Sequence, residues 1–141
     1  MSGQTELARQ CAAAMMSNDR ASQRLGIVVD IPTAGSAVAR MTVTSDMLNG
    51  FDICHGGVLF TLADTAFAFA CNAYNDLSVA ASGSVDYLLP AHAGDELTAT
   101  ATEELRSGRR GYYRVDLCNQ EGQLVAVFHG RSAARGEPLL K

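Results

Sequence analysis

Tryptophan is absent from the 141 residues, and proline occurs only three times. The 13 glycines follow no collagen-like period, and no segment is of low complexity. An excess of positive charge is also missing, because the formal net charge is −4. Proteins that hold nucleic acid through its phosphates need a basic surface. The composition therefore excludes a fibrous chain and argues against a nucleic-acid-binding module.

Export and membrane signals are lacking as well. No basic segment followed by an apolar stretch opens the sequence, so we expect no signal peptide. The most apolar stretch, from Val58 to Cys71, is too short to span a bilayer and contains Asp64. The four cysteines lie far apart without a C-x-x-C pair, which is typical of free thiols in a reducing compartment. We therefore expect a cytoplasmic protein with no membrane partner.

The composition is sufficient for a folded hydrophobic core. Hydrophobic residues make up 48% and charged residues 18% of the chain. The length fits a single domain over 1–141. Good helix formers predict an N-terminal helix over about 4–16, and we expect the core over about 26–132. Alternating apolar residues predict the first two strands at 26–31 and 37–44.

After an irregular loop over 45–55, the pattern changes at Gly56. From there to about Ala73 nearly every position is apolar and proline is absent, which predicts a long helix that is buried on most sides. Further strands are expected at 77–89, 95–105, 112–119 and 123–131. Their short, turn-like connections imply an antiparallel meander. The sequence thus predicts an α+β fold with one antiparallel sheet wrapped around the long helix.

Asp64 is the strongest single signal for chemistry. It stands among apolar residues in the middle of the predicted long helix, where an ionised carboxylate is costly unless it is paired or used. A purely structural Asp64 would be satisfied by neighbouring groups such as the hydroxyls of Thr61 or Thr65. Buried carboxylates with shifted pKa values are, however, enriched at functional sites. Both interpretations remain open on the residues alone.

The triplet His55, Gly56 and Gly57 comes directly before the long helix. Two glycines leave the first helical amides uncovered, and such N–H groups attract an anion or a developing oxyanion. A glycine turn with His55 as polar cap explains the triplet equally well. Asn49, six residues before His55, is either a plain turn residue or a further site residue.

Other catalytic patterns are absent from the sequence. It contains no G-x-S-x-G elbow, no G-x-G-x-x-G and no Walker loop. The three histidines do not have metal-ligand spacing, and Asp52, Cys54 and His55 lie in one loop without a fourth partner. We therefore predict that the protein uses neither a metal ion nor a cofactor.

The two strongest candidates cannot serve one reacting group within a single helix. Asp64 follows Gly56 by eight residues, which is about 12 Å along a helix axis. If both belong to one site, a second copy of the helix, running antiparallel, must bring its Asp64 beside this Gly56. A two-fold homodimer would create two such composite sites.

The stretch from Asn49 to Ala66, NGFDICHGGVLFTLADTA, resembles the motif of hotdog-fold acyl-CoA thioesterases, and most closely the PaaI-type phenylacetyl-CoA thioesterases. The segments DYLLPA at 86–91 and GDELTA at 94–99 match the same family. The resemblance covers about 26–132. It implies a hotdog fold, hydrolysis of an acyl-CoA or aryl-CoA substrate without metal or cofactor, and a homodimer with shared active sites that pairs into a homotetramer.

The resemblance also implies roles for single residues. Gly56 would offer its N–H to the thioester carbonyl, with Asn49 as a second polarising or water-holding group and His55 orienting the loop. Asp64 of the other subunit would act as general base or nucleophile. Some relatives have a serine or threonine in the next strand, where this chain has Ala80. We expect substrate contacts from Gly57, Phe60, Thr65, Arg109 and Arg110.

The two arginines are the least specific of these assignments. Arg109 and Arg110 belong to a basic last quarter in an otherwise acidic chain, and CoA phosphates need cations. Our leading hypothesis is a thioesterase for phenylacetyl-CoA or its ring-hydroxylated forms. The alternatives are a broad acyl-CoA or hydroxybenzoyl-CoA thioesterase and a non-catalytic acyl-CoA-binding hotdog module. A hotdog dehydratase is disfavoured, because the helix offers no histidine or glutamate base.

Overall fold

The computed structural model describes residues 2–141, which form one sheet and several helices. In chain order the elements are α1 (Gly3–Asn18), α2 (Arg20–Arg24), β1 (Val28–Asp30), β2 (Ser36–Thr42), η1 (Ser45–Met47), α3 (Gly56–Cys71), β3 (Ser78–Tyr87), β4 (Glu96–Ser107), β5 (Arg110–Cys118) and β6 (Leu124–Ala134). The predicted N-terminal helix, long helix and six strands are all present. The short helix α2 and the 3₁₀ turn η1 were not predicted.

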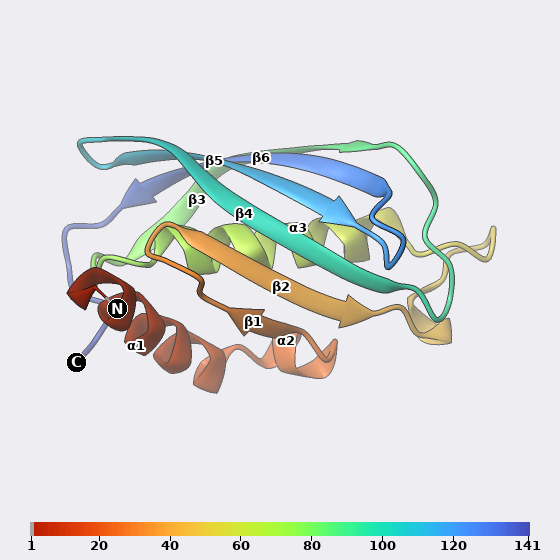
Figure 1. Cartoon of the computed structure of the whole chain (residues 1–141), viewed down its shortest axis with the longest axis horizontal. Helices are drawn as coiled ribbons and strands as arrows, with labels where there is room; N and C mark the ends of the chain where they lie inside the picture. Colours follow the sequence, from red (N-terminus) through yellow and green to blue (C-terminus); the bar gives the residue numbers. More distant parts are fainter. Residues whose placement is uncertain (1) are drawn as a thin grey trace.

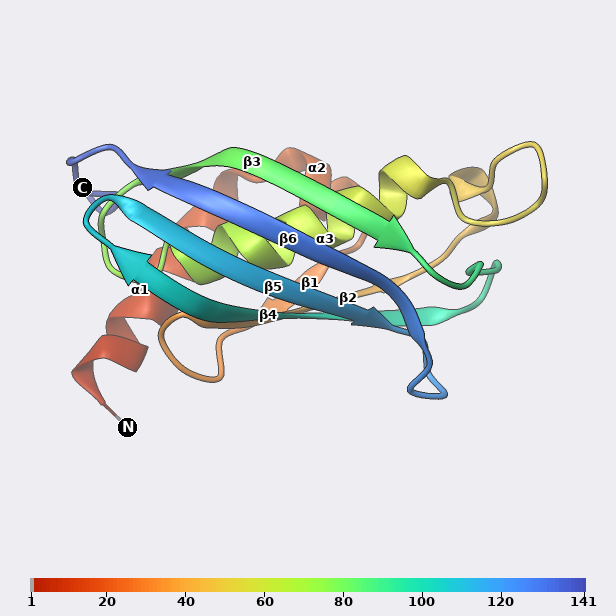
Figure 2. The ribbon, with the colours of Figure 1, turned by 90° about the horizontal axis from the view of Figure 1, so that it is seen from above.

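The strands form one antiparallel sheet in the order β1-β2-β4-β5-β6-β3. The predicted meander is right for β4, β5 and β6 but wrong for β3, which lies at the far edge beside β6 (Figure 2). Both sides of β4 are already taken by β2 and β5, so β3 cannot pair with the strand that follows it in sequence. Among the described strands, β3 pairs with β6 alone and therefore leaves one edge open.

Helix α3 packs against the concave face of the sheet, and α1 lies on the other side of α3 (Figure 1). The strand positions that face α3 are buried and alternate with exposed ones, as period-2 strands require. Several of them are alanines, such as Ala39 and the paired Ala99, which lets the helix approach the sheet closely. The core is therefore continuous from the sheet into α3.

The predicted long helix ends at Cys71, two residues earlier than expected. Asn72 caps it: the side-chain amide donates to the carbonyls of Ala68 at 2.9 Å and Ser78 at 3.0 Å, and the backbone N–H of Ser78 donates to Asn72 Oδ1 at 2.8 Å. This side chain is buried and ties the end of α3 to the start of β3. It sets where the chain re-enters the sheet.

Candidate active site

The loop before α3 is built around Asn49. Its Oδ1 accepts hydrogen bonds from the backbone N–H groups of Phe51 at 2.9 Å and Ile53 at 3.4 Å, and its own N–H donates to the Ile53 carbonyl at 2.8 Å. Asp52 at the loop tip adopts a left-handed φ of 59°. The loop projects beyond the start of α3 (Figure 1). Because the carboxamide oxygen of Asn49 is engaged, its NH₂ group is the part left for a ligand.

His55 is the N-cap of α3, and its Nδ1 accepts a 3.0 Å hydrogen bond from the Gly57 N–H. The N–H groups of Val58 and Leu59 both donate to the His55 carbonyl. The Gly56 N–H has no partner among the described residues. Of the two glycines, Gly56 alone therefore presents a free donor at the positive end of the helix dipole.

Tyr87, at the end of β3, covers Gly56. Its hydroxyl donates a 2.8 Å hydrogen bond to the Gly56 carbonyl. A Cβ added to Gly56 would lie 3.0 Å from the Tyr87 ring carbon Cζ, closer than ordinary contact. The sequence analysis missed this residue, since nothing in the stretch DYLLPA indicates a contact that spans 31 positions. A side chain at position 56 would therefore have to displace this aromatic ring.

A cavity of about 480 Å³ opens beside the free amide. Its lining residues are Asn49, Ile53, Cys54, Gly56, Leu59 and Tyr87 to Ala91. Most of these groups are apolar, so a ligand carbonyl placed at Gly56 would be partly shielded from water. Burial raises the pKa of the Cys54 thiol to about 11, which keeps the sulfur protonated near neutral pH. Cys54 is therefore not poised as a nucleophile.

Asp64 lies two turns further along α3 and is half-buried. Its carboxylate makes no hydrogen bond or ion pair with any residue of the described chain. Desolvation by the surrounding groups raises its pKa above the ordinary value. The purely structural interpretation required hydroxyl partners, which Asp64 does not have. An uncompensated carboxylate of this kind is typical of a functional site.

Asp64 belongs to the one side of α3 that is not fully covered. Beyond the first turn, the partly exposed residues of the helix are Phe60, Thr61, Asp64 and Ala68. Phe60, Asp64 and Ala68 recur every four positions, and Thr61 is three positions before Asp64. The four residues therefore share a face, which we call the open face of α3. Phe60 on this face also packs edge-on against Phe128, with ring centroids 5.2 Å apart.

The other predicted hydroxyl positions are less suited to chemistry. Thr65 is buried, and its hydroxyl donates at 2.7 Å to the Thr61 carbonyl within the helix, so the donor side of this hydroxyl is engaged. Ala80 is exposed on β3, next to an irregularity in the pairing with β6 between Ala80 and Ser82. It brings no polar group to this strand.

Arg109 and Arg110 lie at the opposite end of α3 from Gly56. They line a small cavity that also includes Cys71, the last residue of the helix. A 16-residue helix is about 24 Å long, so one chain cannot bring Gly56 and this arginine pair to the same small group. The predicted site residues therefore fall into three places along one helix: its start, its middle and its end.

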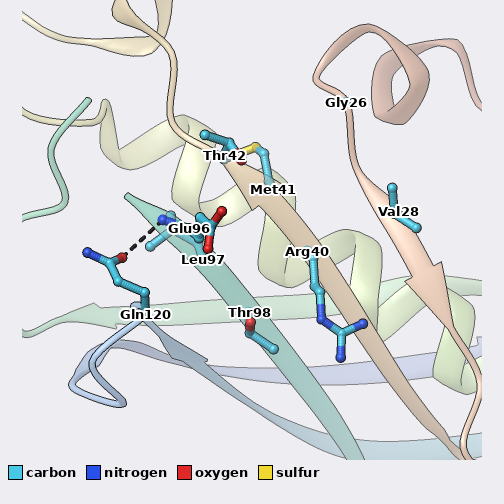
Figure 3. A pocket seen from close by; sticks show the side chains of 9 residues that line it. All are labelled: Gly26, Val28, Arg40, Met41, Thr42, Glu96, Leu97, Thr98 and Gln120. Carbon is cyan, nitrogen blue, oxygen red and sulfur yellow. Dashed lines mark hydrogen bonds between the residues drawn. The ribbon is translucent and has the colours of Figure 1, made fainter. Parts of the chain in front are cut away.

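A further cavity of about 430 Å³ lies on the outer face of the sheet, between β1, β2 and β4 (Figure 3). The exposed side chains of Arg40 and Thr42 and the partly buried Thr98 line it, and Gln120 accepts a 3.0 Å hydrogen bond from the Glu96 N–H. The sheet separates this cavity from α3. It takes no part in the arrangement around Gly56 and Asp64.

No helix in residues 2–141 is long and apolar enough to cross a membrane. No group of three or more histidine, cysteine or acidic side chains in this range is arranged to hold a metal ion. The four cysteines are free, and three of them are buried.

Comparison with known proteins identifies the family. The model of the thioesterase superfamily matches residues 51–126. The acyl-coenzyme A thioesterase PaaI of Escherichia coli K12 is 47% identical over 87% of this chain and 88% of its own. The solved structure of E. coli PaaI, from the phenylacetic acid degradation operon, superposes with a TM-score of 0.94 at 44% identity, over 96% of this chain and 99% of that one.

A more distant relative adds information on the fold and its ligand. A hypothetical thioesterase of Streptococcus pneumoniae TIGR4, solved with coenzyme A, has a TM-score of 0.75 and 25% identity over 79% of this chain and 90% of its own. The predicted α+β hotdog architecture and the predicted family are therefore confirmed. The chain belongs to the thioesterase superfamily, with PaaI among its close relatives.

Proposed function

We propose that this thioesterase hydrolyses CoA thioesters of phenylacetic acid or its ring-hydroxylated forms to the free acid and CoA. The observation that carries the proposal is the 47% identity to PaaI, whose solved structure is assigned to the phenylacetic acid degradation operon. The S. pneumoniae relative with coenzyme A supports CoA as the carrier. A free helix N-terminal donor and an unpaired carboxylate on α3 are the groups this reaction needs.

Gly56 donates its free N–H to the thioester carbonyl in the proposed mechanism. Negative charge develops on that oxygen as the carbonyl carbon becomes tetrahedral, and a donor in a water-poor site stabilises it by about 3–4 kcal/mol. The NH₂ group of Asn49 is the second donor or holds the attacking water. His55 acts indirectly, because its Nδ1 occupies the Gly57 amide and fixes the first turn of α3.

Asp64 supplies the base or the nucleophile. As a base, its carboxylate takes a proton from water while the water oxygen attacks the carbonyl carbon, and the carbon–sulfur bond then breaks to release CoA as thiolate. As a nucleophile, its carboxylate oxygen attacks the carbonyl carbon, and the carbon–sulfur bond breaks to release CoA as thiolate. Water then hydrolyses the resulting mixed anhydride to the free acid and the regenerated carboxylate. A pKa raised by burial suits either role, since it makes the carboxylate more basic.

A second copy of the chain completes each site. Gly56 and Asp64 are about 12 Å apart along one helix, so the Asp64 that meets a given Gly56 comes from an antiparallel partner. The open face of α3 and the unpaired edge of β3 support this assembly, because both are left uncovered in the single chain. The result is a homodimer with two equivalent sites. Its pairing into a homotetramer stays a prediction.

The structure supports the other predicted substrate contacts to different degrees. Phe60 shares the open face with Asp64, which supports a contact with the substrate, whereas the Gly57 amide and the donor side of the Thr65 hydroxyl are already engaged. In the antiparallel dimer, the partner's Gly56 lies beside Asp64. Asp64 is nearer the C-terminal end of its α3 than Gly56 of the same chain is. Arg109 and Arg110 at that end are therefore our proposal for the CoA phosphates.

A panel of thioesters tests the proposal. Phenylacetyl-, hydroxyphenylacetyl-, benzoyl- and straight-chain acyl-CoA are compared with the wild type and Asp64→Asn. We expect the highest kcat/KM for the two phenylacetyl esters. Equal rates across the panel would favour the broad-range alternative, and a preference for benzoyl esters would favour the hydroxybenzoyl type. Binding without turnover would support the non-catalytic module, although an unpaired carboxylate has no evident use in a pure binder.

A further inference from the structure

A cavity of about 650 Å³ lies beside the open face of α3, outside the site described so far. Its walls come from the second half of α1, the last turns of α3, the start of β3 and the segment Leu139–Lys141. The lining residues are Ala14, Met15, Ser17, Asn18, Ala68, Asn72, Leu77, Ser78, Leu139, Leu140 and Lys141. Elements that are distant in sequence thus meet around one space.

The cavity begins one helical turn from Asp64. Ala68 lines it and also belongs to the open face of α3, four residues after Asp64. Four residues advance about 6 Å along the helix axis and return to nearly the same side. An arm of a thioester held at Asp64 that runs along the open face toward the end of α3 therefore reaches the mouth of this cavity.

Three of the polar side chains in the wall are occupied by the protein itself. Asn72 bonds Ala68 and Ser78 through both ends of its carboxamide. The Ser17 hydroxyl donates to the Ala14 carbonyl at 2.7 Å, and that of Ser78 donates to the Asp76 carbonyl at 3.0 Å. What remains for a ligand is the Asn18 side chain and apolar surface from alanine, leucine and methionine side chains. Lys141 is the one cationic residue of the lining.

Hydrogen bonds hold the segment 135–141 against the loop that follows α3. The Leu140 N–H donates to Asn75 Oδ1 at 2.7 Å, and the Gly136 N–H donates to Asp76 Oδ1 at 3.1 Å. The Leu77 N–H donates to the Glu137 carbonyl at 2.8 Å. Leu139 and Leu140 are partly buried, whereas residues 135–138 are exposed. The loop after α3 therefore holds the two leucines against the cavity.

We infer that this cavity receives the acyl group of the substrate and that Leu140, with Leu139 beside it, limits the size of that group. The inference rests on the proposed function, because it uses the thioester held at Asp64. The other arm of the substrate, pantetheine with its phosphates, needs several polar and cationic partners, of which this lining offers only Asn18 and Lys141. An aryl ring or a short alkyl chain needs only apolar contact.

The test is a change of acyl selectivity. Phenylacetyl-, naphthylacetyl- and propionyl-CoA are compared in Leu140→Ala and Leu140→Phe. Leu140→Ala opens the cavity, and we expect the ratio of kcat/KM for naphthylacetyl- to phenylacetyl-CoA to rise about tenfold. Leu140→Phe narrows it and should lower that ratio while leaving propionyl-CoA within about twofold of wild type. The matched control is Leu105→Ala, an exposed leucine on β4 that should leave all ratios unchanged.

A substitution at Asn75 loosens the segment that carries Leu140 without changing a residue of the cavity lining. Asn75 accepts the Leu140 N–H and has a left-handed φ of 55°, which glycine adopts readily. Asn75→Gly therefore releases the segment without backbone strain and should relax selectivity in the direction of Leu140→Ala. This variant also carries the test if a substitution at Leu140 prevents folding.

Each outcome decides the inference. If the ratio of kcat/KM for naphthylacetyl- to phenylacetyl-CoA stays within twofold of wild type in Leu140→Ala, Leu140→Phe and Asn75→Gly, the inference is overturned. An equal fall for every thioester would overturn it too, because the cavity would then hold the CoA arm. If the wild type hydrolyses none of these esters, the proposed function fails first. The cavity is then tested by calorimetry with phenylacetic acid, whose binding must weaken at least fivefold in Leu140→Phe if the cavity takes aryl groups.

Discussion

The hydroxyl of Tyr87 at the end of β3 donates a 2.8 Å hydrogen bond to the carbonyl of Gly56, the first residue of α3. Two segments that are 31 residues apart thus meet at the proposed oxyanion site. The His55 side chain holds the next amide, that of Gly57, at 3.0 Å. Together these contacts fix the first turn of α3 and leave the Gly56 N–H free, which is the preorganisation that oxyanion stabilisation requires.

Tyr87→Phe removes this hydrogen bond and keeps the ring over Gly56. A hydrogen bond of about 1 kcal/mol corresponds to roughly a fivefold change in rate. We expect kcat to fall by about that factor with little change in KM, since the bond orients the donor rather than the substrate. Steady-state kinetics measure the two constants. Tyr112→Phe, on the partly exposed Tyr112 of β5, is the control and should behave as wild type.

Asp64→Asn is nearly isosteric and removes the base or nucleophile. We expect kcat to fall by roughly 10²–10⁴-fold with a smaller change in KM. Asp30→Asn, an exposed aspartate on the opposite edge strand β1, should leave turnover unchanged. If Asp64→Asn retained more than about a third of the wild-type kcat, Asp64 would have no part in the chemistry.

The same substitution should stabilise the protein at neutral pH. Burial raises the Asp64 pKa above the ordinary 3.8, so the folded state holds this proton more tightly than the unfolded state does. The ionised form therefore costs stability, and this cost grows as the pH rises from 3.8 through the raised pKa. We expect Asp64→Asn to have the higher Tm at pH 7 and the same Tm as wild type below about pH 3.5. A lower Tm for the variant at pH 7 would contradict the desolvation argument.

The sequence predicted most elements, because each depends on local pattern: the apolar run that forms α3, the alternation of the strands and the glycines at the helix start. It misplaced β3, whose position beside β6 depends on which edges of the sheet remain free. The contact between Tyr87 and Gly56 and the anchoring of Leu140 by Asn75 could not be predicted either. Both join segments that only tertiary packing brings together.

Charge removal at Arg109 and Arg110 tests the proposed CoA contact. We expect the double change to glutamine to raise KM for every CoA ester with little effect on kcat, since the phosphates lie far from the reacting carbon. The effect should shrink as salt is added, because these are surface charges. Arg40→Gln, on the outer face of the sheet, is the matched control. A KM that stays unchanged at low salt would remove both arginines from the site.

The shared site is tested by mixing two defective chains, Asp64→Asn and Gly56→Pro. Proline removes the amide donor and is tolerated at a first helical position, and the extended His55 before it, with ψ of 132°, suits a following proline. The new ring would press on Tyr87, which is 51% exposed and has room to move. Each homodimer should be nearly inactive, because every one of its sites lacks one partner.

In a mixed dimer, one site combines both lesions, while the other combines an intact Gly56 with the partner's intact Asp64. Co-refolding equal amounts makes about half of the dimers mixed, each with one working site by random pairing. Roughly a quarter of wild-type activity should therefore return, and native mass spectrometry can count the mixed dimers. If they form and activity stays at the level of the parents, Gly56 and Asp64 do not act on the same thioester from two chains.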